Sequence, residues 1–132
     1  MSKILIVEDE ESQRKALRDN LTREGFFILE ARDGVEGLST ALREHPDIIL
    51  LDVRMPKMDG MEMMHKLRKD TWGKEATIII LTNYDTNDTQ LKQIITDQPS
   101  YYLLKASSRL EDILEKIREV LESKREAETL AS

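Results

Sequence analysis

Short apolar runs alternate along the chain with longer stretches in which apolar residues return every three or four positions. The runs are Ile4–Val7, Phe26–Leu29, Ile48–Leu51, Ile78–Leu81 and Tyr101–Leu104. Each run is continuous rather than alternating, which is typical of strands that are covered on both faces. The regular succession of strand and helix predicts a doubly wound α/β fold: a five-stranded parallel sheet of order 2-1-3-4-5 with helices on both faces.

The stretches between the runs carry helical patterns of unequal strength. The last one has the clearest 3–4 spacing, and Ser108 with Glu111 has the pattern of a capping box at its start. The stretch Thr86–Asp97 is the weakest, because it opens with poor helix formers, and we expect a short, locally unstable helix there. The residues that share the stripes of the first, second and last helices are Ala16, Leu17 and Leu21; Val35, Leu38 and Leu42; and Leu110, Ile113, Leu114, Ile117, Val120 and Leu121.

The bulk composition limits the classes of function. The 132 residues suit one domain, and we expect it to span 1–123, with a charged helix extension or linker at 124–132. The net charge of −6 gives no electrostatic attraction to a phosphate backbone, which argues against direct nucleic-acid binding. No apolar stretch approaches the length of a membrane span, and the absence of cysteine excludes disulfides and is compatible with a reducing cytoplasm.

Acidic residues stand directly after two of the apolar runs. Glu8 and Asp9 follow the first run, and Asp52 follows the third. With the order 2-1-3-4-5 these runs are neighbours, so we expect the three carboxylates to meet at the carboxyl edge of the sheet. Two like charges about 4 Å apart repel by roughly 4 kcal/mol at an effective dielectric of about 20. A divalent cation such as Mg²⁺ is the simplest group that would hold them together.

The fourth and fifth runs add a hydroxyl and an ammonium to the same edge. Thr82 follows Leu81, and Lys105 follows Leu104. A carboxylate can act as a nucleophile towards phosphorus and form an aspartyl phosphate. A metal ion, Lys105 and Thr82 would then supply positive charge and hydrogen-bond donors to the phosphoryl oxygens.

Four segments match a known pattern: Ile4–Glu10, Asp47–Gly60, Leu81–Thr82 and Tyr102–Lys105. Through them, and over almost its whole length, the chain resembles the receiver domain of bacterial two-component response regulators, which has a flavodoxin-like fold. The resemblance implies a cytoplasmic signalling domain rather than an enzyme. Its partners would be a sensor histidine kinase or phosphotransfer protein and either a downstream protein or a second copy of the chain.

The resemblance also implies a role for each site residue. Asp52 would accept the phosphoryl group, and Asp9 would ligate Mg²⁺ directly, with Glu8 acting through water. Asp52 and the backbone carbonyl of Arg54 would complete the protein ligands of the metal. Lys105 would pair with the phosphate.

Two residues would read out the phosphorylated state. Thr82 would move to hydrogen-bond the phosphate, and Tyr102 would turn inward with it. This coupled movement would remodel the face made by the helix expected over Thr86–Asp97, the strand Tyr101–Leu104 and the last helix. Such domains usually dimerise or meet their partners at that face.

The chain departs from the family pattern close to the site. Ala106 stands where the family usually has a cis-proline, and without proline a cis peptide costs about 3 kcal/mol. Asn83 replaces a very small residue, and Gln98–Pro99 replaces a Gly-Ala pair. Bulky residues also lie two positions after Asp52 and Thr82, where they would screen attacking water, and they predict slow self-dephosphorylation. These residues are Arg54 and Tyr84.

Other interpretations stay open at this level. A receiver-shaped interaction module that takes no phosphate is the main alternative, and a flavin carrier is disfavoured by the acidic residues after the first strand. A Mg²⁺-dependent phosphatase would need a second acid where Arg54 stands. His45 and His65 lack partners at ligand spacing, and Trp72 is expected to cap apolar surface. We expect some members of the methionine cluster to pack in the core: Met55, Met58, Met61, Met63 and Met64.

Overall fold

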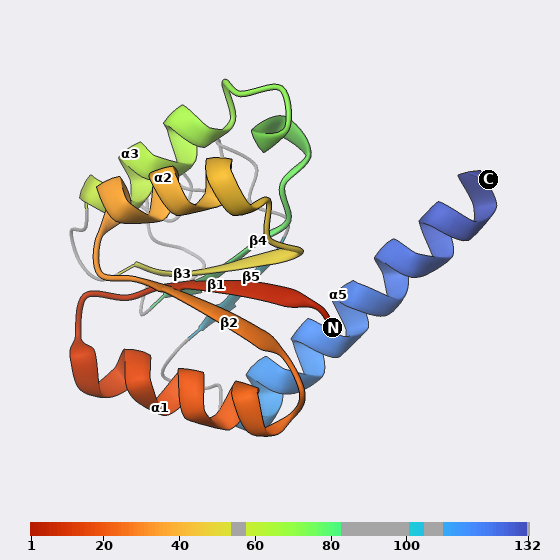
Figure 1. Cartoon of the computed structure of the whole chain (residues 1–132), viewed down its shortest axis with the longest axis horizontal. Helices are drawn as coiled ribbons and strands as arrows, with labels where there is room; N and C mark the ends of the chain where they lie inside the picture. The colour runs from red at the N-terminus through yellow and green to blue at the C-terminus, as the bar shows by residue number, and fades with distance from the viewer. Residues whose placement is uncertain (54–57, 83–100, 105–109, 132) are drawn as a thin grey trace.

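The sheet has five parallel strands in the order β2-β1-β3-β4-β5 (Figure 1). The structure is a computed structural model, and it describes residues 1–53, 58–82, 101–104 and 110–131. The strands are β1 Lys3–Val7, β2 Phe27–Ala31, β3 Ile48–Val53, β4 Ile78–Thr82 and β5 Tyr101–Leu104. The predicted fold class, strand order and number of strands are confirmed.

Helices cover both faces of this sheet. The helices are α1 Glu11–Arg23, α2 Gly34–Glu44, α3 Met58–Leu67 and α5 Leu110–Ala131, with a short 3₁₀ helix at Gly73–Glu75. In Figure 1, α2 and α3 lie on one face of the sheet, and α1 and α5 lie on the other. The helix expected over Thr86–Asp97 and the cap expected at Ser108 fall outside the described residues.

Alternate residues of each strand pack into two separate cores. Leu5 and Val7 of β1 belong to the core under α2 and α3, whereas Ile4 and Ile6 belong to the core under α1 and α5. This alternation follows from the two-residue period of a strand, and it explains why the apolar runs are continuous. Met63 and Met64 are buried in the first core, as expected for part of the methionine cluster.

The edge strand β2 departs from the expected burial on both faces. Phe27 is half exposed, and only Ala31 of this strand is buried. The strand begins one residue later than the apolar run Phe26–Leu29 and ends two residues later. It extends through Glu30, whose carboxylate forms ion pairs with Arg14 and Arg18. An edge strand has a neighbour on one side only, so its side chains receive less cover.

The face through which α2 packs is also different from its apolar stripe. Val35 is 82% exposed, and Leu42 is exposed as well. The buried residues of α2 are instead small, and Gly37 lets the helix approach β1 and α3 closely. A Cβ added at Gly37 would lie 3.0 Å from both the Met63 Sδ and the Val7 Cγ2 atoms. A glycine at this position therefore sets the distance between α2 and the strand that carries Glu8.

The last helix, α5, is continuous through the charged segment that follows Ser123. Its first half packs on the sheet through Ile113, Ile117 and Val120, and its second half projects beyond the sheet (Figure 1). Lys124 Nζ donates a hydrogen bond to the backbone carbonyl of Asp47 at 2.8 Å. The division into a domain at 1–123 and an extension at 124–132 stays a prediction.

Candidate functional site

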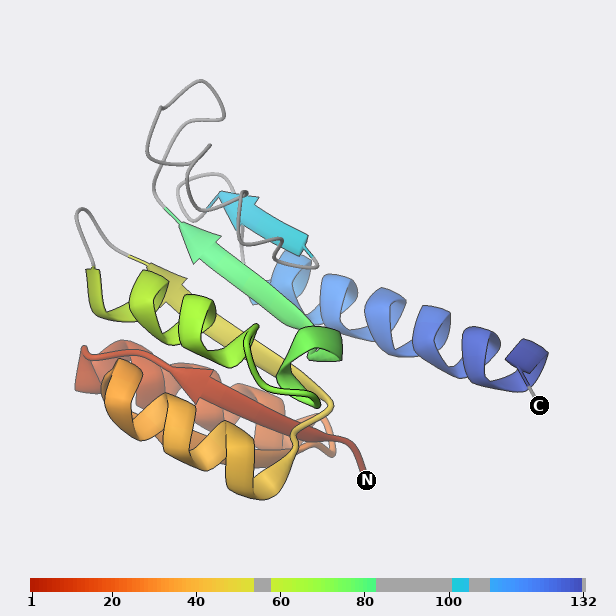
Figure 2. The ribbon, with the colours of Figure 1, turned by 90° about the horizontal axis from the view of Figure 1, so that it is seen from above.

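The register of the sheet brings the expected acidic residues to one edge. Val7 of β1 pairs with Leu51 of β3, so the residues that follow on the two strands are Glu8 and Asp52. Neighbouring strands lie about 4.8 Å apart, which makes these two residues lateral neighbours. Figure 2 shows that the strands point the same way, and this edge is therefore the carboxyl edge of the sheet.

Both of these carboxylates are buried. Glu8 is 1% exposed and Asp52 is 5% exposed, and the Glu8 Oε2 and Asp52 Oδ1 atoms have almost no accessible surface. Burial of an ionised carboxylate is unfavourable by several kcal/mol unless a counter-charge or donors compensate it. An apolar pair of similar volume would often be at least as stable at these two positions. Two neighbouring buried carboxylates therefore indicate a functional role rather than a packing role.

The third acidic residue, Asp9, is in a different environment. It is exposed in the turn between β1 and α1, whereas Glu8 before it is buried. Within the described residues, no three side chains of His, Cys, Asp or Glu are grouped closely enough to hold a metal ion. The described part of the chain thus brings Glu8 and Asp52 together and does not by itself gather all three carboxylates.

A set of backbone and side-chain hydrogen bonds fixes the turn that carries Glu8. The Glu8 N–H donates to the carbonyl of Ala31 at 3.0 Å, and the Glu10 N–H donates to Glu8 Oε1 at 3.1 Å. The Glu8 carbonyl accepts from Arg14 Nη1 at 3.0 Å. Helix α1 starts immediately afterwards at Glu11, whose hydrogen bond with Lys15 lowers the pKa of its carboxyl below the ordinary value.

The remaining site residues are described only in part. Thr82 ends β4 and pairs in register with Val53 on one side and with Leu104 on the other. Tyr102 lies in β5 opposite Ile80. Arg54 and Lys105 lie outside the described residues. The backbone of Thr82 is thus one rung beyond that of Asp52, whose partner on β4 is Leu81.

Sequence reasoning missed two charged residues beside the site, Arg14 and Glu30. Arg14 is 7% exposed, and its Nε donates to Glu30 Oε1 at 3.1 Å. Arg18 Nη1 donates to the other carboxylate oxygen of Glu30 at 3.3 Å. The hydrogen bond to Asp19, and to a smaller extent the one to Glu30, raises the pKa of Arg18. A signal was present, because Arg14 falls on the α1 stripe of Leu17 and Leu21, where an apolar residue is expected.

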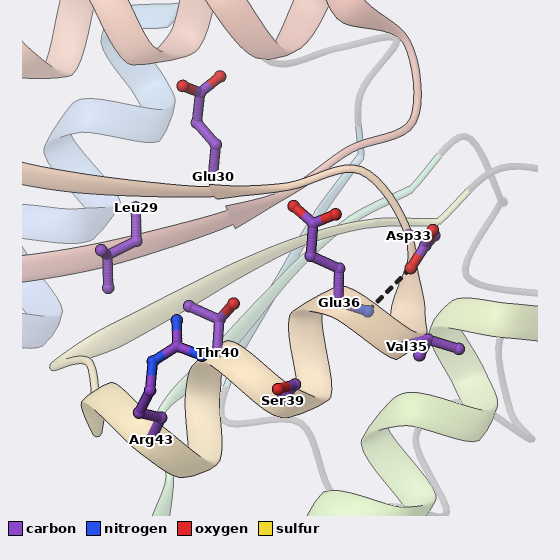
Figure 3. A pocket seen from close by; sticks show the side chains of 8 residues that line it. All are labelled: Leu29, Glu30, Asp33, Val35, Glu36, Ser39, Thr40 and Arg43. Carbon is purple, nitrogen blue, oxygen red and sulfur yellow. Dashed lines mark hydrogen bonds between the residues drawn. The ribbon is translucent and has the colours of Figure 1, made fainter.

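A hollow runs along the outer side of β2 and α2, and the lining residues Asp33 and Glu36 bring one end of it to the carboxyl edge (Figure 3). Its volume is about 590 Å³. Asp33 at its rim accepts a hydrogen bond from the Glu36 N–H at 2.8 Å and so caps α2. In Figure 3, Leu29 and Glu30 point to opposite faces of β2.

Comparison with known proteins identifies the fold and its class of function. A family model described as the response regulator receiver domain matches residues 4–118. The chain belongs to that family. The receiver domain is a signalling module of two-component systems, so the expected resemblance is confirmed over most of the chain.

Individual relatives agree with this assignment. The receiver domain is 34% identical to the response regulator MprA of Mycobacterium leprae over 119 residues, which are 90% of this chain and 50% of MprA. The chain thus spans about half the length of that relative.

Solved receiver structures are also similar. Chemotaxis protein CheY4 of Vibrio cholerae has 30% identity and a TM-score of 0.79, covering 91% of this chain and 98% of CheY4. TrrA of Thermotoga maritima, solved in complex with Mg²⁺-BeF, has 32% identity and a TM-score of 0.75, covering 91% and 99%. Among the described residues of this receiver domain, no helix is both long and apolar enough to span a membrane.

Proposed function

We propose that Asp52 of this receiver domain accepts a phosphoryl group from a histidine kinase or a phosphotransfer protein. The observation that carries the proposal is the buried carboxylate of Asp52 on β3, beside buried Glu8 at the carboxyl edge of the sheet. This is the edge at which open parallel sheets bind their ligands. The position matches the acceptor expected from the sequence.

The transfer is a nucleophilic displacement at phosphorus. One carboxylate oxygen of Asp52 forms the new O–P bond while the bond from phosphorus to the imidazole nitrogen of the donor breaks. The donor histidine leaves with the electron pair of that bond and takes up a proton. The product is an acyl phosphate on Asp52. Its formation changes the charge of the site without turnover of a substrate, as suits a switch rather than an enzyme.

The residues present fit a Mg²⁺ ion, because Mg²⁺ prefers oxygen ligands and keeps several waters, so that one or two carboxylates are enough. Glu8, Asp9 and Asp52, with the carbonyl of Arg54, are the proposed holders. When bound, Mg²⁺ would neutralise charge that develops on the transferring phosphoryl oxygens. The Mg²⁺-BeF complex of the similar TrrA supports this choice of ion.

Readout would pass through Thr82, Lys105 and Tyr102. Thr82 is the register partner of Leu104, the residue before Lys105, and Tyr102 lies two residues earlier on β5. The Thr82 hydroxyl and the Lys105 ammonium would bind the phosphoryl oxygens, and Tyr102 would turn inward with Thr82. Phosphorylation would thereby shift an existing equilibrium of the face formed by the segment Thr86–Asp97, β5 and α5.

The partner of that face would be a downstream protein or a second copy of the chain. The net charge of −6 favours a protein partner over direct binding of nucleic acid by this domain. We also propose a cytoplasmic location, in keeping with a chain that contains no cysteine.

Intact-mass measurement after treatment with acetyl phosphate and Mg²⁺ tests the proposal. Wild-type protein should gain the mass of one phosphoryl group, and Asp52→Ala should gain none. Asp19→Asn is a matched control, because it removes an exposed carboxylate of α1, and it should be labelled like wild type. Equal labelling of wild type and Asp52→Ala would refute the acceptor assignment. An unlabelled wild-type protein would favour the phosphate-independent interaction module.

A further inference from the structure

Arg14 occupies a position that is unfavourable for an arginine in two respects. It lies in the first turn of α1, where the helix dipole disfavours a cation, and its side chain is only 9% exposed. Arginine is rarely buried without partners. The position is therefore explained by what the guanidinium contacts rather than by helix formation or packing.

The guanidinium joins the end of β1 to the edge strand β2. Nη1 donates to the carbonyl oxygen of Glu8 at 3.0 Å, and Nε donates to Glu30 Oε1 at 3.1 Å. The fixed planar fork of arginine suits two acceptors in different directions, which a single ammonium would not serve equally well. Glu30 points away from α2 in Figure 3, towards the side on which α1 lies.

The carbonyl that Arg14 holds belongs to the peptide unit between Glu8 and Asp9. Because a peptide unit is planar, fixing its oxygen fixes the plane that contains both Cα atoms. The Glu8 N–H is fixed separately by the carbonyl of Ala31 at 3.0 Å. The direction in which the Glu8 side chain leaves the backbone is therefore set by Arg14 and by β2 together, and the same contact fixes the position of the Asp9 Cα.

We propose that Arg14 is a positioning residue for the Mg²⁺ ligands of this receiver domain, and that Glu30 holds Arg14 in place. This assignment rests on the proposed function, because it concerns the carboxylates that would hold the metal. Groups that orient metal ligands from behind typically change metal affinity by about 10–100-fold when they are removed.

The sign of the effect separates positioning from simple electrostatics. Arg14 is a cation close to a proposed cation site, so its charge alone opposes Mg²⁺ binding. Loss of that charge would tighten Mg²⁺ binding if charge were the whole role. Loss of the contact with the Glu8 carbonyl would weaken it.

The test is the rate of acetyl phosphate labelling of the 132-residue chain as a function of Mg²⁺ concentration, read by intact mass. Mg²⁺ binding is measured directly by calorimetry. Arg14→Gln should raise the half-saturating Mg²⁺ concentration by roughly tenfold and keep the wild-type rate at saturating Mg²⁺. A merely structural role would lower the labelled fraction without moving the half-saturating concentration.

Arg18→Gln is the matched control. It removes the same charge from the same helix and also takes a partner from Glu30. The Arg18 guanidinium donates to Asp19 and Glu30, whereas the Glu8 carbonyl accepts from Arg14, so half-saturation should stay at the wild-type value or fall. Arg14→Lys, whose single ammonium can serve only one of the two acceptors, should lie between wild type and Arg14→Gln if that acceptor is the Glu8 carbonyl. If Arg14→Gln does not fold, Glu30→Gln removes the second anchor of Arg14 and should raise half-saturation to a smaller extent.

Three results would overturn the assignment: unchanged half-saturation in Arg14→Gln, tighter Mg²⁺ binding in that variant, or equal weakening in Arg14→Gln and Arg18→Gln. A wild-type protein that shows no Mg²⁺-dependent labelling is a different outcome, because it rejects the proposed function itself.

Discussion

The rings of His45 and Trp72 stack face to face, with centroids 4.3 Å apart and planes 4° from parallel. His45 caps the end of α2 in the left-handed conformation, with φ at 46°, and Trp72 packs against the core below α2 and α3. This confirms the expected role of Trp72 as a cap over apolar surface. The stack lies before β3 and β4, at the opposite end of these strands from Asp52.

Substitutions at His45 should separate the stack from the backbone strain. His45→Ala loses a stacking contact and should lower the free energy of unfolding by about 1 kcal/mol. His45→Gly loses the same contact but removes the steric cost of the left-handed backbone conformation, which is about 1 kcal/mol for a residue with a Cβ. Its free energy of unfolding should therefore stay close to that of wild type. Urea denaturation measures both. A glycine variant less stable than the alanine variant would contradict this account, and acetyl phosphate labelling should be unaffected in both.

Gly37→Ala should destabilise the domain although alanine is the better helix former. The new Cβ would lie 3.0 Å from Met63 Sδ and from Val7 Cγ2, and overpacking of this kind costs about 1–3 kcal/mol. The gain in helix propensity returns about 1 kcal/mol, which leaves a net loss of about 1 kcal/mol. Ser39→Ala, at an exposed position of the same helix, should instead be neutral or slightly stabilising in thermal unfolding. A Gly37→Ala protein with a raised Tm would show that α2 moves away without penalty.

The phosphorylated state should be long-lived if Arg54 and Tyr84 screen the acyl phosphate from water. Replacement of both by Ala should speed loss of the label by roughly tenfold, which corresponds to a barrier to hydrolysis lower by about 1.4 kcal/mol. The measurement is the decay of the phosphorylated mass after acetyl phosphate is removed. Equal decay in the double variant and in wild type would exclude a screening role for these two side chains.

Much of the fold was predictable because burial on both faces leaves an unbroken apolar run. β1, β3 and β4 lie inside the sheet, and their runs appear at nearly the observed bounds. Of the two edge strands, β5 has the predicted bounds, whereas β2 was predicted less well, because Glu30 looked like a residue beyond the strand although its charge is paired with Arg14 and Arg18. Arg14 and Arg18 lie 16 and 12 positions before Glu30, and local sequence does not reveal ion pairs over such separations.

The packing of α2 shows a second limit of pattern reasoning. A stripe of large apolar residues predicted a face that includes Val35, but Val35 is 82% exposed. The helix packs through Gly37 and Ala41 instead, because a close approach of two elements needs small residues on one of them. How closely two elements approach depends on the partner, and a single helical stripe does not contain that information.

The candidate site was predictable to the extent that it follows from topology. The strand order alone places Glu8 and Asp52 at one edge, and the observed register makes them lateral neighbours. The contact between Arg14 and the Glu8 carbonyl was not predictable in this way, because it depends on the path of the turn between β1 and α1. Residues that orient ligand-binding groups without contacting the ligand leave a weaker sequence signal than those that contact the ligand.

Location of the phosphoryl group within the chain tests the central claim most directly. The labelled protein is reduced with borohydride, which converts an aspartyl phosphate to homoserine, and its peptides are then sequenced by mass spectrometry. We predict conversion at Asp52 and at no other carboxylate. Conversion at Glu8 or Asp9 with Asp52 intact would contradict the account, because the acceptor would then lie on β1 or in its turn rather than on β3.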